Sequence, residues 1–377
     1  MAILPYLTTT IFDFGAIGKL PRAMADLGIK RPLLVTDKGL MAVGVAATVR
    51  TAMGEEVPVT IFDGTPENPT EEAVLEALSV FRGNDCDGVV GLGGGSSMDL
   101  GRAVAFLATN DVDLCEMAPL DRGKYAPIAP YIAVPTTSGT GSEVSNGFVV
   151  ITRDGRKRTL VSPRFLAGRA ICDPDLTLGL PPRLTAATGM DAVTHGIEAI
   201  LSPVVNPPAE AIALDAIERA IAQGYLERAV ADGSDREARW HMMMASTSAA
   251  LAFSKGLGSI HAMAHSAGRL KDLRLHHGTL NAVIMPVVLR YNADHAADKY
   301  VRIRHALRLG ERADLADMVE NLNARLGLPR NLSEMGLTTA RIPELVPEAV
   351  DDLATVTNPV QPSADDYERL FEEAITK

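Results

Sequence analysis

The chain has 377 residues, more than one domain usually contains, so we expect two domains. Apolar residues make up 47% and charged residues 22% of the chain, a balance typical of a globular protein with enough material for a core. The formal net charge of -11 argues against a general affinity for nucleic acid or for anionic membranes.

In the first half of the chain, short apolar strands alternate with helical stretches. We expect a helix at TEEAVLEALSVFRG (70–83), which has an acidic first turn, and strands at RPLLVTD (31–37), VPVTIFD (57–63), DGVVGLGGG (87–95) and APYIAVP (129–135). Residues 147–172 are typical of a β-hairpin, with its turn at Asp154-Gly155, followed by a further strand. This alternation predicts a mostly parallel, Rossmann-like sheet with helices on both faces.

The pattern changes after the Pro181-Pro182 pair. The later segments, such as LTAATGMDAVTHGIEAIL and ARWHMMMASTSAALAFSKG, have apolar residues at the 3.6-residue spacing of helices and few β-branched runs. We therefore predict an α/β dinucleotide-binding domain over residues 1–181 and an all-helical domain over residues 182–377.

The cysteines and the N-terminus indicate a cytoplasmic protein. Three cysteines, at positions 86, 115 and 172, are far apart and follow no CxxC spacing, which suits a reducing compartment. The first ten residues, MAILPYLTTT, lack a basic region, and their short apolar stretch is interrupted by Pro5. No run approaches the roughly 18 apolar residues of a membrane span.

Two glycine-rich loops follow predicted strands. They are GLGGGSSMD (91–99) and PTTSGTGSE (135–143), and each could let the backbone approach a diphosphate closely, with helix N-terminal amides facing the anion. Neither is the GxGxxG fingerprint. Asp37, at the end of an earlier strand, could hold a ribose hydroxyl, or it could simply cap a helix. Two such loops in succession favour a nucleotide site.

The helical half carries two pairs of metal-type ligands at helical spacing. Asp191 and His195 are four residues apart, His261 and His265 repeat that spacing, and the doublet His276-His277 follows. A single pair of this kind is more often a surface pair, but two pairs on apolar helices need partners, and a shared cation would supply them. One carboxylate with several imidazoles suits Fe(II), Zn(II), Ni(II) or Co(II), and the ligand types do not choose among these ions.

Taken together, these motifs make the whole chain resemble the iron-containing (group III) alcohol dehydrogenase family. The specific part of the resemblance is a set of motifs in family order: VTDKG, GLGGGSSMD, PTTSGTGSEV, GMDAVTHGIEA, GLGSIHAMAH and HHGTLNAV. The resemblance implies a dinucleotide-binding domain followed by a helical metal-binding domain of the dehydroquinate synthase-like fold. It also implies NAD and a divalent metal, Fe²⁺ or else Zn²⁺, as cofactors.

The resemblance assigns roles by position. The metal ligands would be Asp191, His195, His261 and His277. His265 would correspond to a histidine that relays a proton. The cofactor-binding residues would be Asp37, which favours NAD over NADP, together with Gly94, Gly95, Ser96, Asp99, Thr136, Thr137, Thr140 and Lys157.

The sequence departs from the family pattern between His265 and His277, where the stretch is longer and SAGRLKDLR stands in place of the usual proline. The doubled histidine leaves the fourth ligand open between His276 and His277, of which we favour His277. The segments LHHGTLNAVIMP and CDPDLTLGLP most resemble bacterial 4-hydroxybutyrate dehydrogenases. A carboxylate of such a substrate would need a basic residue, and the candidates, which could equally be solvated loop charges, are Arg269, Lys271 and Arg274.

The expected reaction oxidises a small alcohol or reduces the matching aldehyde. The metal ion would make the alcohol more acidic, the hydride would pass to the nicotinamide ring, and the proton would leave through His265 or water. Relatives commonly form homodimers or larger homo-oligomers, and we expect the same here. The alternatives are a dehydrogenase of a simple diol or unsubstituted alcohol, a dehydroquinate synthase-like enzyme and a maleylacetate reductase-like enzyme.

Overall fold

The computed structural model describes residues 8–121, 124–270 and 272–377, so Lys271 lies outside the described residues. The chain divides into two compact units. Among the described residues, the sheet unit runs from Thr8 to Leu178 without Ser138–Thr140, and the helical unit comprises Ser138–Thr140 and Gly179–Lys377. The expected domain boundary, between residues 181 and 182, lies three residues beyond the end of the sheet unit at Leu178.

The sheet unit contains a six-stranded parallel sheet with the strand order β1-β8-β5-β4-β2-β3. The prediction of a parallel sheet is therefore confirmed. Its strands are β1 (Thr10–Phe12), β2 (Pro32–Val35), β3 (Thr60–Phe62), β4 (Gly88–Gly93), β5 (Tyr131–Pro135) and β8 (Arg169–Cys172).

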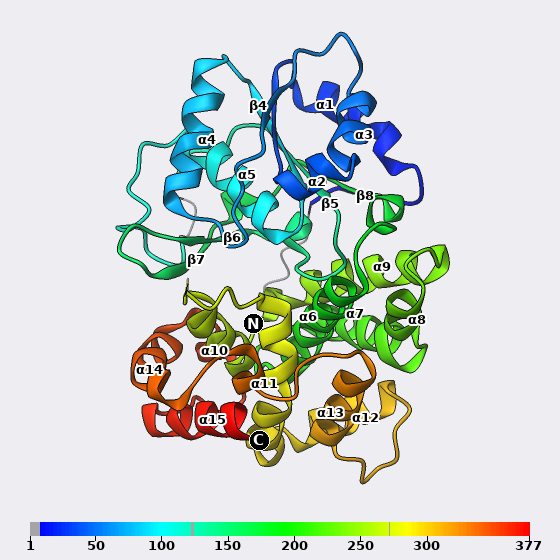
Figure 1. Ribbon diagram of the computed structural model, residues 1–377, viewed down its shortest axis with the longest axis vertical. Coiled ribbons are helices and arrows are strands. Elements are labelled where there is room, and N and C mark those ends of the chain that lie inside the picture. The colour runs from blue at the N-terminus through cyan, green and yellow to red at the C-terminus, as the bar shows by residue number, and fades with distance from the viewer. Residues whose placement is uncertain (1–7, 122–123, 271) are drawn as a thin grey trace. The chain divides into compact units, whose positions relative to one another are not determined.

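Helices cover both faces of this sheet, and the alternation of side chains along each strand explains why. Leu33 and Val35 of β2 join a core with α4 and α5, whereas Leu34 points into a second core with α1 and α3. Figure 1 shows the two helix pairs on opposite sides of the sheet. The helices of this unit are α1 (Leu20–Leu27), α2 (Lys38–Ala42), α3 (Val45–Ala52), α4 (Glu71–Gly83) and α5 (Gly95–Leu107).

An antiparallel hairpin of β6 (Gly147–Ile151) and β7 (Lys157–Val161) follows the fifth strand of the sheet. Ile151 pairs with Lys157, so the turn falls at Asp154 and Gly155, and Gly155 has the positive φ of 80° that such a turn requires. The predicted hairpin and its turn are confirmed.

The prediction of an all-helical second half is confirmed, and the helical unit contains ten α-helices within the described residues. They are α6 (Pro182–Leu201), α7 (Pro207–Ile217), α8 (Tyr225–Ala231), α9 (Arg236–Ala252), α10 (Ser259–Gly268), α11 (His277–Asn292), α12 (Ala297–Ala306), α13 (Leu315–Arg325), α14 (Ile342–Asp351) and α15 (Ala364–Thr376), and a π-helical turn η5 (Glu218–Ala222) extends α7. No helix in the part of the chain that the structure describes is long and apolar enough to span a bilayer.

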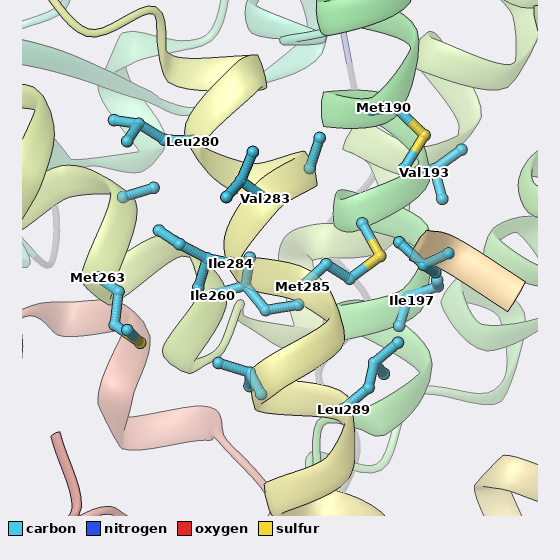
Figure 2. Packing of buried hydrophobic residues seen from close by; sticks show 14 of the residues in the cluster. Met190, Val193, Ile197, Ile260, Met263, Leu280, Val283, Ile284, Met285 and Leu289 are labelled. Carbon is cyan, nitrogen blue, oxygen red and sulfur yellow. The ribbon is translucent and has the colours of Figure 1, made fainter. Parts of the chain in front are cut away.

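Three helices that lie far apart in the sequence form the centre of the helical core. Figure 2 shows Met190, Val193 and Ile197 of α6 facing apolar side chains of α11, with Ile260 and Met263 of α10 on the other side of α11. All five of these side chains are at most 1% exposed. This packing fixes α6, α10 and α11 against one another, and these are the helices that carry the predicted metal ligands.

Short 3-10 helices connect the main elements of both units. They are η1 (Ala16–Lys19), η2 (Ser142–Val144), η3 (Pro163–Phe165), η4 (Pro174–Thr177), η6 (Phe253–Lys255), η7 (Ala293–His295), η8 (Leu332–Met335), η9 (Thr339–Arg341) and η10 (Leu353–Thr357).

Candidate metal centre and cofactor loops

Donor atoms from three helices converge at one point of the helical unit. Asp191 of α6, His261 of α10 and His277 of α11 each present a ligand atom within 4.8 Å of the other two. The Asp191 Oδ1 lies 3.7 Å from His261 Nε2 and 3.7 Å from His277 Nε2. His261 and His277 follow Asp191 by 70 and 86 residues in the sequence, so tertiary packing alone brings the three side chains together.

His195, the fourth predicted ligand, lies beside this group, outside the 4.8 Å limit that the other three residues satisfy. It follows Asp191 by one helical turn on α6, and its ring stacks on the ring of His261 with 4.6 Å between centroids. The alternative fourth ligand, His276, is the N-cap residue of α11, and its Nδ1 lies 3.5 Å from the Thr279 hydroxyl. Of the doublet, His277 is therefore the residue that faces Asp191.

A glycine explains how His277 comes so close to α6. A Cβ atom on Gly278 would lie 2.3 Å from the Ala187 carbonyl oxygen and 3.3 Å from the Asp191 Cβ. Any side chain at this position would push the first turn of α11 away from α6. The HHG sequence thus combines a ligand with the small residue that allows its helix to approach.

Two polar residues that were not predicted from the sequence, Asn281 and Glu198, form hydrogen bonds with the ligands. Asn281 donates from Nδ2 to Asp191 Oδ1 at 2.7 Å, and the same nitrogen lies 3.2 Å from His261 Nε2 and 3.2 Å from His277 Nε2. Glu198 accepts from His261 Nδ1 at 2.6 Å. Both could have been suspected, because Asn281 follows His277 by four residues and Glu198 follows Asp191 by seven, the spacings of one helix face.

The electrostatics keep Asp191 ionised and His195 neutral, which are the forms that bind a cation, whereas His261 would have to release a proton to do so. Burial raises the pKa of the Asp191 carboxyl, but the surrounding imidazoles outweigh it and hold this pKa well below its ordinary value. Burial lowers the pKa of His195 to about 4, against the opposing effect of Asp191. Burial also lowers the pKa of His261, yet the Glu198 and Asp191 carboxylates outweigh it and raise that pKa to about 9.

These residues fit a divalent transition metal. Donors about 2.1 Å from a tetrahedrally coordinated ion lie about 3.4 Å from one another, close to the separations of Asp191 from the two imidazole nitrogens. In addition, Asn281 Oδ1 is buried without a hydrogen-bond partner among the described residues. Buried polar atoms are nearly always satisfied in folded proteins, so the cluster has capacity for a further group.

His265 lies next to the ligands and is held by a carboxylate of its own. Its Nδ1 donates to Asp352 Oδ2 at 2.9 Å, and its ring stacks on that of His277 with 5.3 Å between centroids and 11° between planes. Asp352 also accepts from the backbone N–H of Ala354, at the start of η10. This arrangement leaves Nε2 of His265 available to accept or deliver a proton.

The first glycine-rich loop joins β4 to α5, as the sequence predicts. Gly93 ends the strand at φ 148°. Gly94 is the N-cap residue of α5 and Gly95 is its first residue, so no side chain shields the backbone where the helix begins. A Cβ on Gly94 would lie 3.5 Å from the methyl group of Thr137. The two predicted loops are therefore neighbours at this point of the sheet unit. Such a helix N-terminus favours a bound phosphate.

The predicted contacts in this loop have different environments. Ser96 donates from its hydroxyl to the Glu67 carbonyl oxygen at 2.6 Å. Asp99 is buried, and its carboxylate accepts from the Ser142 hydroxyl at 2.6 Å and from the Val149 N–H at 2.9 Å. Burial raises the pKa of Asp99 although Arg102, 3.6 Å away, opposes this effect. Asp99 therefore ties α5 to the second loop and to the hairpin.

The remaining predicted cofactor residues are distributed over both units. Thr136 is buried, the Thr137 hydroxyl is buried without a hydrogen-bond partner among the described residues, and Thr140 belongs to the short segment that groups with the helical unit. Lys157 of β7 donates to Asn68 Oδ1 at 3.0 Å. Asp37 caps α2 by accepting from the Leu40 N–H at 3.0 Å, which is the structural role that the sequence left open.

A Rossmann-like sheet with a glycine-rich strand-to-helix loop, together with a helical carboxylate–imidazole cluster, defines the class of metal-dependent, nucleotide-binding enzymes. Residues 8–174 match the family model for iron-containing alcohol dehydrogenase, and residues 185–375 match the model for the C-terminal part of the Fe-containing alcohol dehydrogenase family. The chain belongs to the iron-containing alcohol dehydrogenase family. The resemblance noted in its motifs is therefore confirmed.

Individual relatives extend this result over the full chain. The sequence is 49% identical over 385 residues to 4-hydroxybutyrate dehydrogenase of Cupriavidus necator, with 100% of both chains covered. The fold matches a crystal structure of 1,3-propanediol oxidoreductase with a TM-score of 0.93 at 35% identity, covering 99% of this chain and 100% of the other. Sulfoacetaldehyde reductase from Bifidobacterium kashiwanohense, solved in complex with NAD⁺, matches with a TM-score of 0.87 at 28% identity, covering 100% of both chains. The protein is thus an NAD-dependent alcohol dehydrogenase of the type that uses a divalent metal.

Proposed function

We propose that this enzyme transfers a hydride between NAD(H) and a small primary alcohol, and that ω-hydroxy acids such as 4-hydroxybutyrate are its main substrates. The proposed metal is Fe²⁺, with Zn²⁺ as a possible substitute, held by Asp191, His195, His261 and His277. The single observation that carries this proposal is the convergence of donor atoms from α6, α10 and α11 within 4.8 Å. We further propose a cytoplasmic homodimer or larger homo-oligomer, as expected from the cysteine pattern and the family.

A divalent cation in this cluster would supply a Lewis acid that makes an alcohol hydroxyl more acidic, and the nicotinamide ring would accept the hydride. The alcohol carbon loses a hydride and the hydroxyl loses a proton, which leaves an aldehyde and NADH. The proposed task of His265 is to take up that proton at Nε2 while Asp352 holds its Nδ1 hydrogen. In the direction of aldehyde reduction, the same nitrogen returns the proton.

The cofactor would lie along the two glycine-rich loops, residues 91–99 and 135–143. The amides at the start of α5, which follow Gly94, suit the diphosphate, and the Thr137 hydroxyl has no hydrogen-bond partner among the described residues and could bind it. Asp37 would accept from a ribose hydroxyl with the carboxylate oxygen that does not cap α2. The assignments of Gly94, Gly95, Ser96, Asp99, Thr136, Thr140 and Lys157 to the cofactor remain proposals of the same kind.

The preference for an ω-hydroxy acid is supported by the similarity to 4-hydroxybutyrate dehydrogenase and by one basic residue. Arg274 lies between His265 and His277, is exposed, and has a φ of 48°, a left-handed conformation that costs free energy in a residue other than glycine. Arg269 instead donates to the Glu344 carbonyl oxygen at 2.6 Å. We therefore assign the substrate carboxylate to Arg274 in preference to Arg269, and Lys271 lies outside the described residues.

The test compares substrates that differ in one group. Metal-free protein is reconstituted with Fe²⁺ or Zn²⁺ and assayed with 4-hydroxybutyrate, 1,3-propanediol and 1-butanol, each with NAD⁺ and NADP⁺. We expect activity only with metal, a preference for NAD⁺ and the highest kcat/KM for 4-hydroxybutyrate.

The Arg274→Gln variant should lose about tenfold in kcat/KM for the acid, because a hydrogen bond to a charged group contributes about 1.5 kcal/mol or more. The same variant should leave kcat/KM for 1-butanol unchanged, and Arg269→Gln is the matched control. An enzyme that turns over 1-butanol as well as the acid would contradict the proposed substrate class.

A further inference from the structure

We propose that Glu198 is a positioning residue that fixes which nitrogen of His261 faces the metal, and thereby sets the metal affinity of the whole centre. The inference rests on the proposed metal site. Its basis is a short contact between two side chains that are almost completely buried, since the Glu198 side chain is 3% exposed and that of His261 is 1% exposed.

The two oxygens of Glu198 have separate partners at the start of α10. Oε2 accepts from His261 Nδ1 at 2.6 Å, and Oε1 accepts from the Ile260 backbone N–H at 2.8 Å. The first amides of a helix favour negative charge, so this position suits a carboxylate. Because both oxygens are engaged, the carboxylate cannot rotate without losing a hydrogen bond.

Space for this carboxylate is provided by Gly258, the residue before α10. A Cβ at that position would lie 2.8 Å from Glu198 Oε1 and 3.2 Å from its Cδ. Gly258 has φ −148°, an extended conformation open to any residue, so the glycine is needed here for its small size. The GLGSIHAMAH motif therefore carries both the ligand and the room for the carboxylate that orients it.

The consequence for His261 follows from the chemistry of imidazole. A neutral imidazole carries one N–H, and a carboxylate at Nδ1 keeps that hydrogen there, so the lone pair is on Nε2. Nε2 is the nitrogen that faces Asp191, at 3.7 Å from its Oδ1. A carboxylate behind a ligating histidine also makes the imidazole a stronger donor to the metal.

His195 shows the contrast within the same centre. No carboxylate of the described residues binds its buried Nδ1, and its ring interacts instead with the backbone of Gly139. Glu198 lies one turn beyond His195 on the same face of α6, yet its carboxylate binds the imidazole of α10. Glu198 therefore couples two of the three helices that supply ligands.

The test is the Glu198→Gln variant. Its amide can keep the bond from the Ile260 N–H to Oε1, but the other end of the side chain becomes an N–H donor facing His261 Nδ1. This donor favours the His261 tautomer that carries its hydrogen on Nε2. In that tautomer Nε2 has no lone pair with which to bind a metal. We expect the dissociation constant for Zn²⁺, measured by competition with a chromophoric chelator, to rise about 10- to 100-fold.

The control variant is Asn358→Ala. Asn358 Oδ1 accepts from the Ser259 N–H at 3.1 Å, so it caps the same helix, and its other side-chain hydrogen bonds are to Asn292 and Val360. This variant should lower the melting temperature measured in chelator and leave the Zn²⁺ affinity unchanged. If Glu198→Gln binds Zn²⁺ as tightly as the natural protein, or if both variants lose affinity equally, the positioning role is refuted while the metal site stands.

Two further outcomes are decisive. Failure of the unchanged protein to bind any Zn²⁺ would overturn the proposed function itself, and with it this inference. If Glu198→Gln does not fold, the imidazole ¹⁵N spectrum of the unchanged Zn²⁺-bound protein still tests the proposal. A hydrogen on Nδ1 of His261 would support it, and a zinc-bound Nδ1 would overturn it.

Discussion

Two clusters of potential metal ligands occur among the described residues, one in each unit, and they differ in how their charge is balanced. In the sheet unit, Glu71, Asp113 and Cys115 come together around Arg153. The Arg153 guanidinium donates to Glu71 Oε1 and to Asp113 Oδ1, both at 2.8 Å. In the helical unit, the ion-pair partners of Asp191 among the described residues are histidines.

This difference shows why the proximity of ligand atoms does not by itself indicate a metal site. The sheet-unit cluster already contains a permanent cation, and its carboxylates are satisfied without a further ion. The helical-unit cluster has a buried anion, several imidazoles that are neutral when they bind metal, and a buried polar atom, Asn281 Oδ1, without a hydrogen-bond partner among the described residues. A divalent ion would complete the second cluster and has no place in the first.

The largest effect that would sharpen this contrast is expected for Asp191→Ala. Removal of the only anionic ligand should abolish stoichiometric Zn²⁺ or Fe²⁺ binding. It should also lower kcat/KM at least about 10³-fold, because a Lewis acid contributes several kcal/mol and 1.36 kcal/mol is a factor of ten.

Metal content by mass spectrometry and steady-state kinetics measure this result. Cys115→Ser, in the other cluster, is the matched control and should keep full metal content. Metal retained by Asp191→Ala but lost by Cys115→Ser would reverse the assignment of the two clusters.

A smaller effect is expected for His265, which lies beside the ligands without belonging to them. His265→Ala should keep its metal and lose about 10²-fold in kcat, the lower range for loss of general acid–base catalysis, since water can take its place. The kcat of Asp352→Asn should lie between those of His265→Ala and the natural enzyme, because this variant disturbs the orientation of the His265 ring but keeps the ring. Kinetics and metal analysis of both variants are the measurements, and loss of metal from His265→Ala would make it a ligand instead.

In the sheet-unit cluster, Arg153→Ala should affect stability and not metal binding. Glu71 is buried and would lose a charged partner, so the urea concentration at the unfolding midpoint should fall. Urea unfolding measures the loss, and metal analysis should still give one ion per chain. A second bound ion in this variant would show that the Glu71 cluster can also bind a metal, which would contradict the contrast between the two clusters.

The smallest effect is expected at the hairpin turn of the sheet unit. Burial raises the pKa of Asp154, but the Thr152 hydroxyl and the Arg158 guanidinium outweigh it and lower this pKa to about 2. The folded state then binds the proton more weakly than the unfolded state, so the carboxylate contributes stability above about pH 4, and this contribution disappears as the pH falls through about 2.

Asp154→Asn should therefore lower the free energy of unfolding by less than about 1 kcal/mol near pH 7, because the Asp154 side chain is partly exposed to water. The difference from the natural protein in urea unfolding should shrink below about pH 4. A difference that increased on acidification would contradict the assigned pKa shift.

Local signals in the sequence predicted most of the fold. Asp154-Gly155 gave the hairpin turn because that turn needs a residue with positive φ, and the apolar alternation along the strands gave a sheet covered on both faces. The helical spacing of Asp191 and His195 gave their common face on α6. Each of these features depends on residues close together in the chain.

The features of the two clusters that could not be predicted depend on distant contacts. Asp352 binds His265 across 87 residues, and nothing in the sequence around Asp352 marks it as the partner of a histidine. Arg153 completes the Glu71 cluster across 82 residues, and without it the sequence shows only scattered charges. Tertiary packing decides both contacts, so only the folded structure reveals them.

The central claim is that one divalent ion is bound by side chains of α6, α10 and α11. The most direct test is a crystal structure of the Zn²⁺-bound protein with anomalous data at the zinc edge. We predict one strong anomalous peak per chain, surrounded by Asp191, His195, His261 and His277. No peak at this position, or a stronger peak beside Glu71 and Asp113, would contradict the account.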